Sequence, residues 1–114
     1  MPVLYGIANC DTVKKARASL QAQSREARFH DFKKAGVPAD RLDAWIAAVG
    51  WERLLNRKGT TWRQLDPASQ TAVTDAVSAK RLMLAQPSVI KRPVVEWPAG
   101  AITVGFSEAD FAAR

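Results

Sequence analysis

The spacing of apolar residues changes twice along this chain, and these changes constrain its fold more than any other feature of the sequence. Residues 3–7 form a continuous apolar, β-prone run, which predicts a buried strand at the N-terminus. From residue 11 onward, apolar residues recur every three or four positions, at Val13, Ala16 and Leu20, and predict an amphipathic helix. Cys10 therefore lies where a strand turns sharply into a helix.

The next half of the chain is mostly helical in pattern. A second strand is predicted over residues 28–32, followed by a loop over residues 33–38. Residues 39–49 carry apolar positions at helical spacing and stop at Gly50, and residues 67 to about 86 predict two helical pieces. Four apolar residues of this last stretch are expected to face inward: Val73, Ala76, Val77 and Leu84.

The C-terminal segment returns to strands and completes a recognisable order of elements. Residues 94–97 and 101–104 predict a β-hairpin, and Ser107 begins a last helix that carries Phe111. Strand, helix, strand, a helical middle, then hairpin and helix is the order of an α/β thioredoxin-like fold. We expect a four-stranded mixed sheet with an inserted helical subdomain. The first crossover should be parallel and right-handed, and the hairpin antiparallel.

The length of the chain suits one domain of this kind. A chain of 114 residues buries about two-thirds of its surface on folding, so we expect a single thioredoxin-like domain over residues 1–114. About residues 1–34 and 88–114 would form its core, and about residues 37–87 the helical insertion. The apolar runs are short, and the N-terminus lacks the regions of a secretory signal. We therefore expect a cytoplasmic protein that has no contact with membranes.

Charge and cysteine content limit the kinds of chemistry available. Lysine and arginine number 17 against 11 acidic residues, and the net charge of +6 favours anionic partners. The basic residues are scattered in pairs, as on a solvated surface, and we expect no direct binding of nucleic acid. One cysteine excludes an internal disulfide, and one histidine excludes a common zinc site, so no metal is expected. Redox chemistry would need one thiol of this chain and a second thiol from a partner.

Cys10 is the residue best placed to carry chemistry. At a helix N-terminus a thiol meets free backbone N–H groups and the positive end of the helix dipole, and both favour the thiolate. Lys14 lies one turn along on the same face and Arg17 nearly two turns along, so their charges can add to this effect. Asn9 and Asp11 suit the first turn as cap or dipole partner. Asp11 would raise the thiol pKa unless it points away, and the alternative role for Cys10 is a buried, inert side chain.

Two arginines are further candidates. Arg92 and Pro93 stand just before the predicted third strand, where a cis X-Pro bond and a plain turn proline are both possible. Arg92 could hold a carboxylate or an oxyanion in a bidentate manner, or could be solvated. Arg57, in a polar stretch, has the same two interpretations. We interpret Trp45 as a core residue and His30 as structural or exposed.

Several segments of the chain resemble one family. The segment around the cysteine, YGIANCDTVKKA over residues 5–16, is similar to the cysteine loop of the arsenate-reductase-like (ArsC/Spx) family. Three further segments resemble that family in the same order: LLNRKGT at 54–60, PSVIKRPVV at 87–95 and VGFSE at 104–108. The resemblance covers essentially the whole chain and is greatest to the YffB subgroup.

This resemblance implies a set of roles. Cys10 would be the nucleophile, Arg92 would lie in the active-site cleft, and the Arg92–Pro93 bond would be cis. No bound cofactor is implied; glutathione would be the co-substrate, and glutaredoxin a further thiol partner. The residues implied in binding substrate or glutathione are Asn9, Asp11, Thr12, Lys14, Arg57, Arg92 and Pro93.

The chain departs from the family at positions that matter for oxyanions. Arsenate reductases cradle the oxyanion with three arginines, near a histidine four residues before the cysteine and an arginine four residues after it. Here these two flanking positions hold Gly6 and Lys14, and the last of the three arginines falls on Gly105. Arg57 matches the middle arginine only with a shift of one residue. The second cysteine of the Spx redox pair is Val13.

These observations favour a glutathione-dependent thiol reductase. The Cys10 thiolate would attack an oxidised sulfur, and glutathione would resolve the mixed disulfide. Two alternatives stay open. One is reduction of arsenate or a related oxyanion, which Gly6 and Gly105 argue against. The other is a non-catalytic, Spx-like regulatory protein that contacts RNA polymerase or another partner, which would not need a cysteine at a helix N-terminus.

Overall fold

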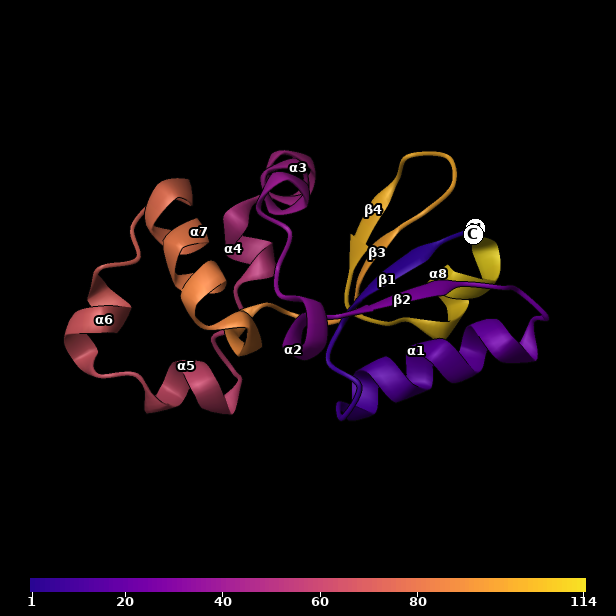
Figure 1. The fold of residues 1–114 in the computed structure, drawn as a ribbon, viewed down its shortest axis with the longest axis horizontal. Helices are drawn as coiled ribbons and strands as arrows, with labels where there is room; N and C mark the ends of the chain where they lie inside the picture. Colours follow the sequence, from indigo (N-terminus) through magenta and orange to yellow (C-terminus); the bar gives the residue numbers. More distant parts are fainter. The chain divides into compact units, whose positions relative to one another are not determined.

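The structure described is a computed structural model of the whole chain, residues 1–114 (Figure 1). The chain forms two compact units. The first, Met1–Ala35 with Arg92–Arg114, contains all four strands and is called here the α/β unit. The second, Gly36–Lys91, is called the helical unit.

A four-stranded mixed sheet organises the α/β unit, as the sequence predicts. Its strands are β1 (Val3–Gly6), β2 (Arg28–Asp31), β3 (Val94–Glu96) and β4 (Ile102–Val104), in the order β2-β1-β3-β4. β1 pairs in parallel with β2 across the crossover through α1 (Asp11–Ala22), and β3 is antiparallel to both β1 and β4. The parallel crossover and the antiparallel hairpin are therefore confirmed.

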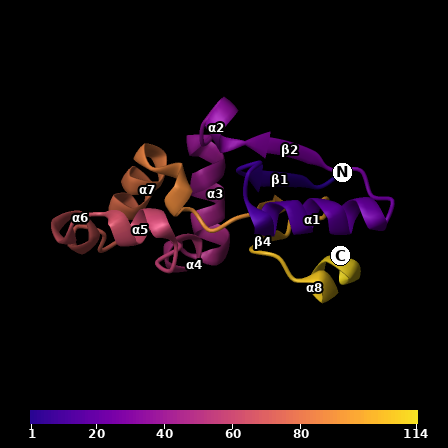
Figure 2. The ribbon, with the colours of Figure 1, turned by 90° about the horizontal axis from the view of Figure 1, so that it is seen from below.

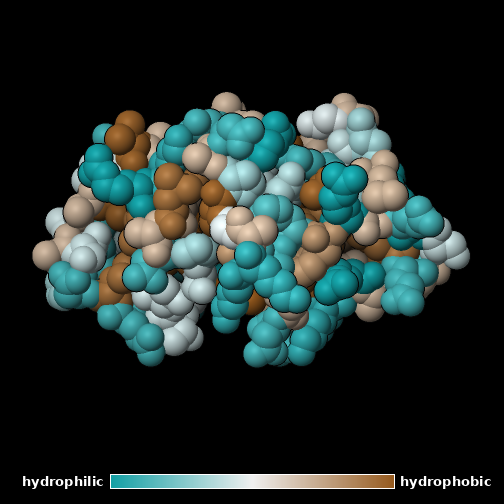
Figure 3. Space-filling model, in the orientation of Figure 1, coloured by the Kyte–Doolittle hydropathy of each residue, from teal (hydrophilic) through white to brown (hydrophobic).

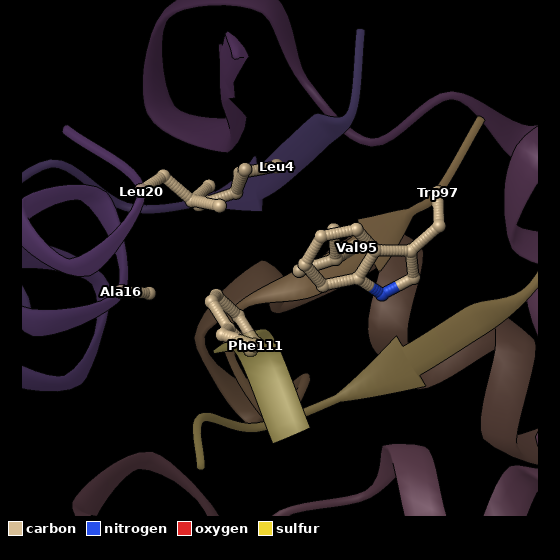
Figure 4. Close-up of a cluster of buried hydrophobic side chains, with 6 residues drawn as sticks. All are labelled: Leu4, Ala16, Leu20, Val95, Trp97 and Phe111. Carbon is tan, nitrogen blue, oxygen red and sulfur yellow. The ribbon is translucent and has the colours of Figure 1, made fainter. Parts of the chain in front are cut away.

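One apolar cluster joins two helices of this unit to the same face of the sheet. Its members, shown in Figure 4, are Leu4, Ala16, Leu20, Val95, Trp97 and Phe111. Phe111 comes from α8 (Glu108–Ala113), which begins at Ser107, whose side chain accepts a hydrogen bond from the Asp110 N–H. The Phe111 ring meets the Trp97 ring edge to face at 5.0 Å. Full burial of such side chains stabilises the fold by roughly 1.5–3 kcal/mol each.

One predicted loop is wrong at its start. Instead of a loop over residues 33–38, a short helix, α2 (Phe32–Ala35), follows β2 directly. Phe32 is buried, and the Asp31 carboxylate accepts a hydrogen bond from the Lys33 N–H at 2.9 Å. A hydrogen bond from a backbone N–H to an acidic side chain two residues earlier favours a helical turn at this point. The spacing of apolar residues does not reveal this bond.

The helical unit contains six short helical segments, seen from a second direction in Figure 2. They are α3 (Ala39–Val49), α4 (Trp51–Leu54), α5 (Thr60–Gln64), α6 (Pro67–Thr71), α7 (Ala76–Ala85) and the 3₁₀ turn η1 (Pro87–Val89). The predicted helix over residues 39–49 is confirmed, with Leu42 and Trp45 fully buried. The predicted division of residues 67–86 into two pieces is also confirmed, because Asp75 caps a new helix after the break.

The predicted inner face of α7 is wrong for two residues. Val77 is 67% exposed and Leu84 is 40% exposed, whereas Ala79 and Met83 are fully buried. Ala79 and Met83 are four positions apart and define the inner face, while Val77 and Leu84 are seven apart and share the outer one. The apolar pattern could not select the face, because both faces of this helix carry apolar side chains.

The face of the molecule drawn in Figure 3 is mainly hydrophilic. In the view of Figure 3, hydrophobic side chains form small separate groups among hydrophilic ones. The large hydrophobic side chains that are exposed are Met1, Val77 and Leu84. None of the helices is both long enough and apolar enough to span a bilayer.

Candidate active site

Cys10 is the N-cap residue of α1. Its backbone is extended, with φ −137° and ψ 123°, and its carbonyl accepts the first helical hydrogen bond, from the Lys14 N–H at 2.9 Å. The thiol is half-buried and makes no side-chain capping hydrogen bond. The first N–H groups of α1 therefore lack a side-chain cap, beside a sulfur that solvent can reach.

The residues on either side of Cys10 differ in their roles. Asn9 is not the cap, although asparagine is a preferred capping residue; the chain takes up the cap geometry one residue later. The Asn9 side-chain oxygen instead accepts a long hydrogen bond from the Lys14 ammonium, at 3.5 Å on the surface. Asp11 occupies the first turn of α1, as the sequence predicts, and both Asp11 and Thr12 are exposed.

The electrostatic surroundings of the Cys10 thiol favour its ionised form. Burial alone would raise the thiol pKa, but the backbone N–H of Val13 and the Arg92 side chain lower it, and the N–H of Thr12 adds to them. The net result is a thiol pKa below its ordinary value. A partly exposed thiolate of lowered pKa is the form of cysteine that acts as a nucleophile.

Arg92 comes from the far end of the sequence to act on Cys10. It precedes β3 and is joined to Pro93 by a cis peptide bond, so the isomer that the family resemblance implies is confirmed. Pro93 is buried, and its carbonyl accepts a hydrogen bond from the Gly105 N–H at 2.9 Å. The Nε atom of Arg92 is also buried. The Gly105–Pro93 hydrogen bond and the β3–β4 pairing thus fix the backbone from which the Arg92 side chain extends.

Gly6, at the end of β1, permits the close packing of these parts. A Cβ atom at Gly6 would lie 2.9 Å from Val13 Cγ2 and 3.7 Å from Arg92 Cβ. Carbon atoms do not approach to 2.9 Å without something moving, so the first turn of α1 can pack against β1 here only because this residue has no side chain. The glycine that replaces the family's histidine is therefore also a packing requirement.

Arg57 belongs to the helical unit, whereas the other predicted site residues belong to the α/β unit. Its guanidinium carbon lies 5.7 Å from the Trp51 ring centre and 5.8 Å from that of Trp62, which are cation–π distances. The loop that carries it turns tightly at Gly59, where a Cβ would lie 2.8 Å from Asn56 Nδ2. Two aromatic rings thus restrain a side chain that is otherwise exposed.

Two contributors to the site were not predicted from the sequence, and a third was misplaced. Free N–H groups were expected near the thiol, but the sequence pattern does not identify Val13, the third residue of α1, as the main donor. Gly6 was interpreted only as the position of a missing histidine. Arg17 was expected to add charge to Cys10, but its guanidinium lies over the Phe29 ring, 4.4 Å from the ring centre. The apolar spacing of α1 carries no signal for any of these.

Comparison with known proteins places this site in a family. A family model described as the ArsC family matches residues 5–114. The chain belongs to the ArsC family. A relative from Haemophilus influenzae, described as an uncharacterized protein, is 35% identical over 113 residues, which is 99% of this chain and 97% of that protein.

Solved structures agree with this assignment. The structure of a protein named YFFB (PA3664) is 49% identical, with a TM-score of 0.92 over 99% of this chain and 97% of that one. An arsenate reductase (ArsC) related protein from Brucella melitensis is also 49% identical, with a TM-score of 0.76 over 98% of this chain and 92% of that one. The chain is therefore an arsenate-reductase-like protein of the YffB subgroup with a thioredoxin-like fold, and this relationship indicates a redox enzyme.

Proposed function

We propose that this ArsC-family protein is a glutathione-dependent thiol reductase in which Cys10 is the nucleophile. The observation that carries the proposal is the half-buried thiol of Cys10, the N-cap residue of α1, whose pKa lies below its ordinary value. A residue with only a packing role would not need a stabilised thiolate within reach of solvent.

The reaction has two thiol–disulfide exchanges. In the first, the Cys10 thiolate attacks the glutathione sulfur of a mixed disulfide R–S–S–glutathione. The old S–S bond breaks, R–S⁻ leaves and takes a proton from solvent, and Cys10 becomes glutathionylated. In the second, a glutathione thiolate attacks the glutathione sulfur on Cys10, which releases oxidised glutathione and restores the thiolate. The cycle consumes one glutathione thiol: the sum of the two steps converts R–S–S–glutathione and glutathione to R–SH and oxidised glutathione.

The composition of the chain supports a thiol partner from outside. Cys10 is the only cysteine, so no second thiol of this chain can resolve the mixed disulfide. Glutathione carries two carboxylates. Two basic side chains are candidates to bind them: Lys14, four residues after Cys10, and Arg92, which lowers the pKa of the Cys10 thiol. We propose that they bind glutathione through these carboxylates, with Asn9, Asp11, Thr12 and Pro93 as the surrounding surface. Glutaredoxin is a further candidate thiol donor, and the involvement of Arg57 stays a prediction from the sequence.

Oxyanion reduction has less support than thiol reduction. The histidine and the last arginine of the family's oxyanion site are Gly6 and Gly105 here, and a side chain at Gly6 would collide with Val13. Loss of one charged hydrogen bond weakens anion binding by about 10- to 100-fold, and two such contacts are missing. The Spx-like alternative lacks its second cysteine, since that position is the buried Val13.

The proposal can be tested by glutathione-coupled reduction of bis(2-hydroxyethyl) disulfide, followed through NADPH and glutathione reductase. We expect the wild-type protein to turn over, and Cys10→Ser to lose activity by roughly a thousandfold or more, because the nucleophile is removed. Arg63→Gln, which removes an exposed charge from α5, should keep full activity. Full activity in Cys10→Ser, or no glutathione adduct on wild-type Cys10 by intact mass, would contradict the proposal.

A further inference from the structure

A pocket of the α/β unit lies away from Cys10, between the later half of α1 and the start of β2. Its volume is about 200 Å³. Its deepest lining residues are Leu4 and Leu20, which are each 1% exposed, with Phe29 beside them. Arg17, the lining residue nearest to Cys10 in sequence, is seven residues further along α1, or about 10 Å along the helix axis.

Three arginines line this pocket: Arg17, Arg25 and Arg28. No carboxylate lines it, and the remaining polar lining residue, Gln21, is neutral. None of the three guanidiniums forms an ion pair with a carboxylate of this chain. Three uncompensated positive charges therefore surround a small apolar hollow, which is an arrangement that favours an anion.

Two of the three guanidiniums, those of Arg17 and Arg25, are restrained by aromatic rings. The Arg17 guanidinium lies 4.4 Å from the Phe29 ring centre, and that of Arg25 lies 5.3 Å from the Trp97 ring centre. The backbone beneath them is also fixed: the Arg25 N–H bonds the Leu20 carbonyl, and the Arg28 N–H bonds the Pro2 carbonyl, both at 2.9 Å. A stacked guanidinium loses less freedom when it binds an anion, so affinity per contact is higher.

We propose that this pocket binds a small organic phosphate: a phosphomonoester whose body is apolar or aromatic. A dianionic phosphate matches guanidinium forks, each of which can bond it through two parallel N–H groups. The apolar body would lie against Ala27 and Phe29, with the buried side chains of Leu4 and Leu20 beneath them. Inorganic phosphate would leave this apolar surface unused, and a polyanionic chain would not need a hollow of this kind. Nothing in this proposal depends on the reaction at Cys10.

The test uses phenyl phosphate as the probe, titrated into the full-length ¹⁵N-labelled protein and followed by backbone amide shifts. We expect saturable shifts at Leu20, Ala27 and Phe29, and binding at least about tenfold tighter than that of inorganic phosphate or benzoate. Cys10→Ser should bind phenyl phosphate as the wild type does, which separates this site from the proposed reductase site.

Two arginine variants and one matched control locate the binding. Arg28→Gln and Arg17→Gln each remove one exposed guanidinium and should weaken phenyl phosphate about 10- to 100-fold, while the amide spectra show that both proteins are folded. Arg63→Gln removes an equal charge from the helical unit and should leave the affinity unchanged. Equal weakening by Arg63→Gln, equal affinity for inorganic phosphate, or shifts confined to residues 10–13 would each overturn the proposal. Tighter binding of a single-stranded oligonucleotide than of phenyl phosphate would overturn it as well.

Discussion

The N-termini of α1 and α7 differ in how their first backbone N–H groups are used. Each helix begins with backbone N–H groups that have no partner within the helix. At α7, Asp75 accepts the Ser78 N–H at 2.9 Å and Ser78 Oγ accepts the Asp75 N–H at 3.1 Å, a complete capping box. At α1, Cys10 makes no capping hydrogen bond, and the N–H groups of Val13 and Thr12 lower the thiol pKa instead. Thus α7 is stabilised by a side-chain cap, whereas α1 lacks one and its first N–H groups stabilise the Cys10 thiolate instead.

The largest expected effect comes from Gly6→Ala, which disturbs the start of α1 alone. The new methyl group would meet Val13 Cγ2 at 2.9 Å, and overpacking of this kind costs about 1–3 kcal/mol of unfolding free energy. Urea denaturation would measure the loss. In a Val13→Ala background the same substitution should cost much less, because the colliding methyl is gone. An equal cost in both backgrounds would show that this contact is not the reason for the glycine.

Next in size is the effect of Arg92→Gln on the reactivity of Cys10. Removing the guanidinium should raise the thiol pKa, so that at pH 7 less thiolate is present and alkylation by iodoacetamide slows by about tenfold. The two rates should converge at high pH, where both thiols are ionised. Intact mass at a series of pH values gives the two midpoints, with Arg63→Gln as the control. An unchanged midpoint in Arg92→Gln would show that Arg92 does not lower the pKa of the Cys10 thiol.

The smallest effect is expected from Asp75→Ala, which breaks the cap of α7. We expect the melting temperature to fall by a few degrees, while the alkylation midpoint of Cys10 stays unchanged. The bond from the Ser78 N–H lowers the Asp75 pKa, so its stabilising effect is present at neutral pH and is lost as the pH falls through the folded-state value. Melting curves of the two proteins should therefore approach each other in acid. A difference that persists there would point to another cause.

The elements that sequence reasoning predicted are those whose signal is local. The change of apolar spacing at Cys10, the stripe with Leu42 and Trp45, and the cap at Ser107 all depend on neighbours within a few residues. Each of these features survives in the fold because burial and capping act over the same few residues that carry the pattern.

The features that it missed depend on contacts between distant segments or on a choice between near-equal alternatives. The clash that fixes Gly6 involves the end of β1 and the first turn of α1, and the spacing of neither segment reveals it. The stacking of Arg17 on Phe29 joins a helix to an edge strand in the same way. Asn9 and Asp11 were expected to cap or flank the first turn of α1, whereas the N-cap residue is Cys10, which local propensity does not favour.

The sheet also has a consequence for the order of folding. Leu4 of β1 pairs with Phe29 of β2, 25 residues on, but with Val95 of β3, 91 residues on. The entropy lost on closing a loop rises with its length, and slow folding accompanies distant pairings. We therefore expect the β1–α1–β2 crossover to assemble early. The central pairing of β1 with β3, which brings Arg92 to Cys10, should form late, after the 56 residues of Gly36–Lys91 have become compact. The thiol would then gain its lowered pKa only in one of the last steps of folding.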